Sequence, residues 1–290
     1  MFVALLWLVS LLPYGAQVQL SKLIGAILVA PNTRRKRIAH VNIERCFPEL
    51  SPDQRDTLVR QHFQSFVLGI FESGISWWWS IRRFDRLVSI KGLEYLEALD
   101  GQGALLLAFH FTNLDIGAGI VTRFWSADGV YKPHKNAVLE RQLVVGRPKK
   151  MRQLASDEVG RLYETSDLRG IIRALKRGRV IWYAPDQDFG RDRSIFVPFF
   201  NIQTATITAT SKLVKAGGAK VVPMVQRRLP DNKIEVEIMP PLDNFPGAGE
   251  EEDTRRISEL NEKLVKELPA DYLWVHRRFK TRPEGESSFY

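Results

Sequence analysis

Cysteine is nearly absent from this sequence, because Cys46 is the only one among 290 residues. A single cysteine excludes an intrachain disulfide framework and any metal site built from several cysteines of one chain. It fits a protein of a reducing compartment, where thiols stay reduced. The five histidines show no His-Glu-x-x-His spacing. We therefore expect no metal site in this protein.

Short motifs that mark several common enzyme classes are also missing. No Gly-x-Gly-x-x-Gly follows a predicted strand and no Gly-x4-Gly-Lys-Ser/Thr occurs, so dinucleotide and P-loop nucleotide sites lack support. No Gly-x-Ser-x-Gly occurs either, which excludes the nucleophile elbow of the serine hydrolases.

A hydrophobic run long enough to cross a bilayer is missing from residues 1–33. Residues 2–12 are apolar apart from Ser10, but a membrane-spanning helix needs roughly 20 such residues. No basic residue precedes this run and no small-x-small cleavage site follows it, so we expect no removable signal peptide. A weaker apolar segment, 18–30, is followed by the basic cluster 34–37. Because basic residues beside apolar ones favour the anionic cytoplasmic leaflet, we predict a helical membrane anchor over residues 1–33. The alternative is a buried helix with a solvated basic turn.

Acidic residues are outnumbered, since 42 lysines and arginines face 33 aspartates and glutamates, for a net charge of +9. This balance favours anionic partners, namely nucleic acid, acidic lipid or an acidic protein. A long basic stretch, 131–152, contains one acid, Glu140, and seven bases: Lys132, Lys135, Arg141, Arg147, Lys149, Lys150 and Arg152. It is either a solvated face or the rim of a site for a phosphorylated ligand. Aromatic residues are not interleaved with these bases, so nucleic acid is not the expected ligand.

The order of elements predicts the fold class. From Gly101 onward, short apolar strands alternate with amphipathic helices. The predicted strands are 104–109, 129–131, 180–184, 219–225 and, as an edge strand, 233–239; the predicted helices are 116–124, 168–177, 204–216 and 250–268. This alternation predicts an α/β fold with an open, mostly parallel or mixed sheet flanked by helices. We expect residues 34–290 to form a single domain. Upstream, Ser51 with Pro52 and Gln54 predicts another helix start.

The run 104–109 ends abruptly at His110, and Asn113 then offers a helix N-cap. A histidine at the carboxyl end of a buried strand lies where open α/β sheets place their chemistry. With Asp115 in the first helical turn, its carboxylate can fold back onto the imidazole and orient it as a general base. Taken alone, such a histidine is more often a hydrogen-bonded structural residue.

Polar residues follow other predicted strands as well. Asp186 and Asp188 come directly after the strand 180–184, and the basic stretch 131–152 begins where the strand 129–131 ends. In a parallel sheet these positions share one edge with His110. Three polar features at strand ends are harder to explain structurally than one.

Motifs along nearly the whole chain resemble those of one bacterial enzyme family. The pair His110-x4-Asp115 also fits glycerophosphate acyltransferases, whereas the complete ordered set is highly specific. The further segments are Leu12-Pro13-Tyr14, residues 45–51, residues 71–79, Tyr131-Lys132-Pro133 with Asn136, Gly146-Arg147, Trp182 to Gly190, residues 196–200 and residues 276–285. In this order they resemble the lipid A biosynthesis acyltransferases of the lauroyl-transferring, Kdo-lipid IVA type.

The resemblance implies a glycerophosphate-acyltransferase-like fold and an O-acyltransferase reaction in lipopolysaccharide biosynthesis. The implied donor is an acyl carrier protein thioester. The implied acceptor is a hydroxyl on an acyl chain of the phosphorylated, Kdo-modified lipid A precursor, at the cytoplasmic face of the bacterial inner membrane. No metal or redox cofactor is implied, and neither is nucleic acid.

The resemblance also assigns roles to residues. His110 takes the proton from the acceptor hydroxyl, and Asp115 orients the imidazole. Arg147 faces the reacting carbonyl or a phosphate, where a guanidinium stabilises a developing oxyanion. Substrate binding falls to Lys132, Asp186 and Asp188, the last by positioning the substrate or Arg147.

Two other hypotheses remain open at this point. A lysophosphatidate-type acyltransferase shares His110 and Asp115 but uses a glycerophospholipid acceptor and often a coenzyme A donor. A membrane-surface binding module with a decayed site would function without His110. The sequence also departs from the lauroyl branch of the family, which commonly has Glu in place of Asp115 and His in place of Gln187, and residues 148–165 differ from its usual pattern.

Overall fold

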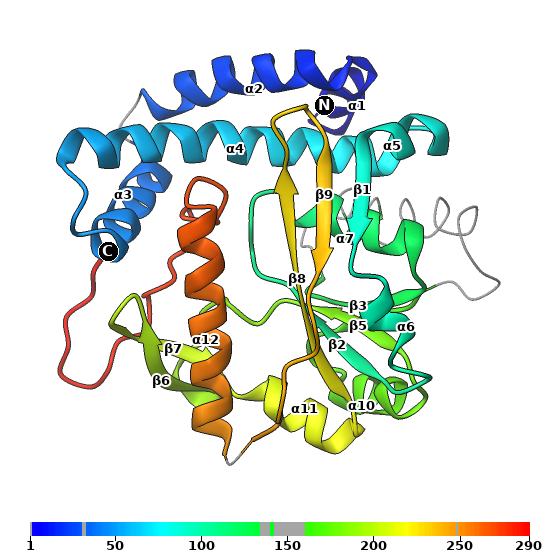
Figure 1. Cartoon of the computed structure of the whole chain (residues 1–290). Coiled ribbons are helices and arrows are strands. Elements are labelled where there is room, and N and C mark those ends of the chain that lie inside the picture. The colour runs from blue at the N-terminus through cyan, green and yellow to red at the C-terminus, as the bar shows by residue number, and fades with distance from the viewer. Residues whose placement is uncertain (1, 31–32, 134–139, 142–159, 248) are drawn as a thin grey trace.

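The computed structural model describes residues 2–30, 33–133, 140–141, 160–247 and 249–290. Its centre is a seven-stranded sheet with helices on both faces, and a two-stranded hairpin lies beside this sheet (Figure 1). The described helices are α1 Phe2–Leu11, α2 Tyr14–Val29, α3 Arg34–Cys46, α4 Pro52–Trp78, α5 Ile81–Leu87, α6 Glu94–Glu97, α7 Leu114–Phe124, α10 Leu168–Lys176, α11 Ala209–Gly217 and α12 Glu250–Glu267.

The large sheet has the strand order β1-β9-β8-β2-β5-β3-β4. Its strands are β1 Val88–Lys91, β2 Ala104–Leu107, β3 Ala127–Tyr131, β4 Leu162–Glu164, β5 Val180–Tyr183, β8 Lys220–Arg228 and β9 Ile234–Ile238. Neighbouring strands pair in parallel except β8 with β9, which are antiparallel. The predicted α/β class with a mostly parallel sheet is confirmed.

Strand β2 lies at the middle of the sheet and is buried on both faces. Leu105 and Leu107 belong to a hydrophobic cluster with α10, α11 and α12. Ala104 and Leu106 belong to a second cluster, with α4 and α7 on the opposite face. Because successive side chains of a strand point to opposite faces, an unbroken apolar run is what a strand buried between two helical layers requires.

Helix α4 spans 27 residues and joins the sheet to the N-terminal helices. It begins with the predicted capping box, in which Ser51 and Gln54 each accept a hydrogen bond from the backbone N–H of the other. Helices α1 and α2 pack along α4 (Figure 1). A Cβ atom on Gly25 of α2 would lie only 2.6 Å from the Cα of Gln64. Glycine therefore permits the close approach of α2 to α4.

The outer side of α1 and α2 is unusually apolar. Among the described residues, nine of the eleven exposed large hydrophobic side chains lie between residues 2 and 28, including Leu5, Leu8, Leu23 and Ile27. None of the described helices is both long and apolar enough to span a bilayer. The division into an anchor over residues 1–33 and a domain over 34–290 stays a prediction.

Two predicted elements are wrong. Residues 204–216 were expected to be one helix, but the structure has strand β7 at Ile202–Ile207 and helix α11 after it. The β-branched run in β7 pairs with β6, Ser194–Phe199, across a two-residue turn in which Phe200 and Asn201 both have positive φ. Strand β9, predicted as an edge strand, is covered by β1, which pairs with it in parallel.

Candidate active site

The pairing of β2 with β5 brings His110 and Asp186 together. Leu107 of β2 lies opposite Tyr183 of β5 in a parallel register. His110 and Asp186 are each the third residue after this pair, so both chains carry them past the same edge of the sheet. Residues 76 positions apart in the sequence thereby become direct neighbours.

Asp186 contacts both the ring and the backbone of His110. Its Oδ1 atom lies 2.6 Å from Nδ1 of the imidazole, and its two carboxylate oxygens accept hydrogen bonds of 3.1 and 3.0 Å from the His110 backbone N–H. Burial raises the pKa of Asp186, but the charge and hydrogen bonds of His110 outweigh it and hold this pKa below its ordinary value. An ionised Asp186 accepts the Nδ1 proton, which leaves Nε2 as the basic nitrogen of the ring.

Asp186 therefore has a different position from the one expected. We predicted that it would bind substrate and that Asp115 would orient His110, but in the structure Asp186 accepts the hydrogen bond from Nδ1 of the ring. Asp115 lies in the first turn of α7, where it lines a pocket together with His110. A catalytic role for Asp115 stays a prediction.

His110 stands at the boundary between two pockets. The larger has a volume of about 800 Å³ and is lined by the ends of β3 and β5 and by α10 and α11. The smaller, of about 270 Å³, lies between α4 and the start of α7. His110, Leu114 and Trp182 line both. The His110 side chain is 23% exposed, so its ring is accessible from the surface at this boundary.

The basic residues predicted for the site are only partly described. Lys132 is exposed and lines the larger pocket, and its role in substrate binding stays a prediction. Arg147, with most of the basic stretch 131–152, lies outside the described residues. Within the described part of the chain, no three histidine, cysteine or acidic side chains are grouped so as to hold a metal ion.

Asp188 holds the C-terminal segment. Its carboxylate accepts hydrogen bonds from the backbone and hydroxyl of Thr281, at 2.7 and 2.8 Å, and from the backbone of Gly190 at 2.9 Å. Its side chain is fully buried and lines neither of the two pockets. A role of Asp188 in positioning the substrate or Arg147 stays a prediction. The Asp188 backbone N–H donates to Nε2 of His276, whose pKa is lowered to about 4 by burial and by nearby positive charges.

The turn that carries His110 is braced by the segment that follows α12. The backbone N–H of Leu273 donates to the His110 carbonyl at 2.9 Å, and that of Thr112 donates to the Asp271 carbonyl at 2.7 Å. A Cβ atom on Gly69 of α4 would lie only 1.9 Å from the Thr112 carbonyl oxygen. Helix α4 therefore approaches the turn as closely as glycine allows.

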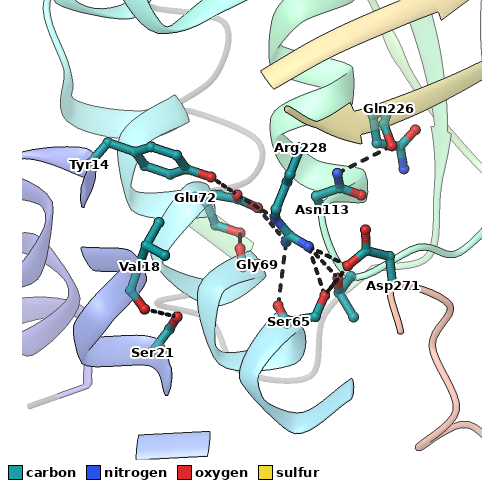
Figure 2. A network of polar contacts seen from close by, with 12 residues as sticks. Tyr14, Val18, Ser21, Ser65, Gly69, Glu72, Asn113, Gln226, Arg228 and Asp271 are labelled. Atoms are coloured by element: carbon teal, nitrogen blue, oxygen red, sulfur yellow. Dashed lines mark hydrogen bonds and ion pairs between the residues drawn. The ribbon is translucent and has the colours of Figure 1, made fainter. Parts of the chain in front are cut away.

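Behind this turn lies a buried polar network around Arg228, at the end of β8 (Figure 2). Its guanidinium forms ion pairs of 2.7 Å with both Asp271 and Glu72, and Tyr14 of α2 donates a 2.7 Å hydrogen bond to Glu72. Ser65 of α4 donates to Asp271. The network connects the N-terminal helices to the active-site turn through α4.

Sequence reasoning missed Arg228, Asp271 and His276 as neighbours of the site. Glu72 and His276 lie within the segments 71–79 and 276–285 that carry the resemblance, but the resemblance predicted no partner for either. The residues around Arg228 do not predict its role, because the residues that it contacts lie 43 to 163 positions away in the sequence.

Comparisons with known proteins place this chain in a family. The sequence model described as "Bacterial lipid A biosynthesis acyltransferase" matches residues 1–281. The lipid A biosynthesis lauroyltransferase of Escherichia coli (strain K12) is 38% identical over 99% of this chain and 93% of its own length. The palmitoleoyltransferase of the same organism is 34% identical over 98% and 92%.

A solved structure is more distantly similar. The 1-acyl-sn-glycerophosphate acyltransferase PlsC from Thermotoga maritima is 16% identical, with a TM-score of 0.43, and the match covers 90% of this chain and 99% of that one. The assignment rests on the sequence matches, which span nearly the whole chain at up to 38% identity. The chain belongs to the bacterial lipid A biosynthesis acyltransferases.

Proposed function

We propose that this protein transfers a fatty acyl chain from an acyl carrier protein thioester to a hydroxyl on an acyl chain of the Kdo-modified lipid A precursor. This reaction is the secondary acylation of lipopolysaccharide biosynthesis. The 38% identity to a lauroyltransferase favours laurate as the transferred chain. The proposal places the reaction at the cytoplasmic face of the bacterial inner membrane.

The observation that carries the proposal is the position of His110 between two pockets, with Asp186 on its Nδ1 atom. Nε2 removes the proton of the acceptor hydroxyl while its oxygen attacks the thioester carbonyl carbon. When the tetrahedral intermediate collapses, the carbon–sulfur bond breaks and the imidazolium gives its proton to the departing thiolate. The products are an ester and a free thiol, so no cofactor is consumed.

Several residues support this chemistry. Asp186 stabilises the imidazolium that forms during proton transfer, because the carboxylate is ionised and almost fully buried beside the ring. We propose that Asp115 contributes from the smaller pocket, that Lys132 binds a phosphate of the acceptor, and that Arg147 stabilises the oxyanion. The resemblance assigns these roles.

Membrane attachment is the second part of the proposal. The exposed leucines of α1 and α2 form an apolar surface beside the basic cluster 34–37. A short helix with such a surface lies in the interface between lipid headgroups and acyl chains, with basic residues near anionic lipid. We propose that this surface holds the protein at the membrane that contains its acceptor.

The test is transfer of radiolabelled laurate from acyl carrier protein to Kdo-lipid IVA by the detergent-solubilised protein. His110→Ala should lower the rate by a factor of about 10² to 10⁴. The matched control is His40→Ala, because His40 lies on α3 and pairs with Asp56, away from both pockets. Acylation of lysophosphatidate in place of Kdo-lipid IVA would refute the proposal, and so would full activity of His110→Ala.

A further inference from the structure

Helix α10 and its C-cap residue carry a stripe of four exposed cations. Arg169, Arg173, Lys176 and Arg177 are spaced by four, three and one residues, so all four lie on one helix face. No carboxylate of the described residues forms an ion pair with any of them. The only acids nearby in sequence are Glu164 and Asp167, and the Asp167 carboxylate caps the helix by accepting from the Gly170 N–H.

Helix stability accounts for only part of this stripe. Basic residues near the end of a helix favour its dipole, which fits Arg173, Lys176 and the C-cap residue Arg177. Arg169 lies in the first turn, where a positive charge is unfavourable, and the acid at this helix end is the N-cap residue Asp167, which bonds to the Gly170 N–H and forms no ion pair with Arg169. The charge at this position therefore suggests a partner outside the chain.

Helix α11 extends the basic surface. The C-terminal ends of the two helices meet, since a Cβ atom on Gly217 would lie 2.7 Å from Cβ of Leu175. Close to this junction in the sequence, Lys215 of α11 and Lys220 at the start of β8 are exposed, whereas Lys212 is paired with Glu250 at 3.2 Å. We call Arg169, Arg173, Lys176, Arg177, Lys215 and Lys220 together the basic face.

The basic face adjoins the mouth of the larger pocket. Leu168 and Ile171 of α10 line this pocket, as do Ala209 and Leu213 of α11. Leu168 is 48% exposed, and Phe189, which also lines the pocket, is 37% exposed. Exposed apolar residues at a pocket mouth, next to unpaired cations, are typical of a protein docking site.

The position of the basic face argues against membrane lipid as its partner. Figure 1 places α10 and α11 at the end of the molecule opposite α1 and α2. When the apolar side of α1 and α2 rests in the bilayer, the basic face lies at the far end of the protein and faces water. A partner at that end must be soluble and acidic.

We infer that the basic face is the docking surface for the acyl carrier protein, an inference that rests on the proposed function. The acidic carrier protein binds the stripe on α10. Its thioester-bearing arm then enters the larger pocket past Leu168 and reaches His110. The donor and the membrane-bound acceptor thus approach the imidazole from opposite ends of the protein.

Charge reversal on the full-length protein tests this inference. The variant Arg169→Glu/Arg173→Glu presents two negative charges to the acidic carrier protein. The dissociation constant of the complex should therefore rise at least about tenfold and become less sensitive to salt. The matched control is Arg82→Glu/Arg86→Glu, which makes the same change at the same spacing on exposed positions of α5. Binding of unacylated holo-carrier protein is measured by fluorescence anisotropy in detergent, and turnover is measured with acyl-pantetheine.

The expected result is weaker carrier-protein binding for the α10 variant alone, with unchanged turnover of acyl-pantetheine. The inference would be overturned if the α5 control bound the carrier protein as weakly as the α10 variant does. It would also be overturned if the α10 variant lost as much turnover with acyl-pantetheine as with the acylated carrier protein. The inference would also be overturned if the α10 variant lost binding to anionic vesicles but still bound the carrier protein normally. A wild-type protein that binds the carrier protein through α10 but transfers no acyl group would refute the proposed function and leave the docking surface intact.

Discussion

Replacing Asp186 by asparagine tests the active-site geometry directly. The two side chains have almost the same shape, but Asp186 accepts hydrogen bonds from Nδ1 and from the backbone N–H of His110 through both of its oxygens. An amide has one acceptor oxygen and one donor nitrogen, so it cannot replace both oxygens. If its NH₂ group faces Nδ1, the imidazole adopts the tautomer with the proton on Nε2, which cannot act as the base.

The expected magnitude follows from these contacts. The asparagine side chain carries no negative charge to stabilise the imidazolium, and part of the protein holds the wrong tautomer. The same substitution in a Ser-His-Asp triad lowers kcat about 10⁴-fold. General-base catalysis as a whole contributes a factor of about 10² to 10⁴, or about 3 to 5 kcal/mol of transition-state stabilisation. We therefore expect Asp186→Asn to lower kcat by about 10² to 10⁴.

The assay is single-turnover transfer from the acyl carrier protein, measured for the wild type, for each single variant and for His110→Ala/Asp186→Asn. Because Asp186 acts through His110, its replacement should have little further effect once His110 is absent. Asp188→Asn is the control for the loss of a buried carboxylate on the same loop, since Asp188 bonds Thr281 and Gly190. Full activity of Asp186→Asn, or an equal loss in the His110→Ala background, would refute the reasoning.

Three further predictions follow from packing, titration and exposure. In Gly69→Ala the new Cβ meets the Thr112 carbonyl oxygen, so overpacking should lower the free energy of unfolding by about 1 to 3 kcal/mol and reduce kcat. Burial lowers the pKa values of His62 and His276 to about 4. As the pH falls from about 6.5 to 4, the unfolded chain binds protons that the folded chain does not, and stability should fall by roughly 3 kcal/mol per histidine. Leu23→Glu, at a site 61% exposed, should weaken vesicle binding about tenfold or more without altering the unfolding midpoint.

Each of these has a measurement that can contradict it. Denaturant unfolding and turnover of Gly69→Ala at wild-type values would show that α4 and the active-site turn can separate freely. Unfolding free energies that stay flat between pH 6.5 and 4 would mean that both histidines titrate normally in the folded state. Unchanged co-sedimentation of Leu23→Glu with anionic vesicles would show that α2 does not contact lipid.

Local sequence determined much of this protein's architecture. The capping box at Ser51 and the apolar strands that became β2 and β5 depend on neighbours within a few residues. The same is true of the end of α10, which is followed by Gly178 with a positive φ. An unbroken apolar run that ends in His110 also predicts a central strand whose carboxyl end faces the candidate site.

Where local signals competed, the sequence was not decisive. The segment 204–216 contains β-branched residues followed by helix formers, and only pairing with β6 decides that its first part is strand β7. Likewise, the alternation in β9 indicates one solvated face, and only the presence of β1 beside it makes it an inner strand. Whether a segment forms a strand depends on the elements that pack beside it and over it. The sequence of the segment alone does not specify those elements.

The identity of the carboxylate on His110 was decided by the tertiary structure alone. Asp115 is five residues from His110 and was the natural candidate from sequence, whereas Asp186 is 76 residues away. The parallel register of Leu107 with Tyr183 brings Asp186 to the ring. Arg228 and its partners likewise meet only when α4, β8 and the C-terminal segment pack together. Sequence determines which groups are present and where each strand ends, but contacts between distant segments depend on register and packing, which only the assembled fold fixes.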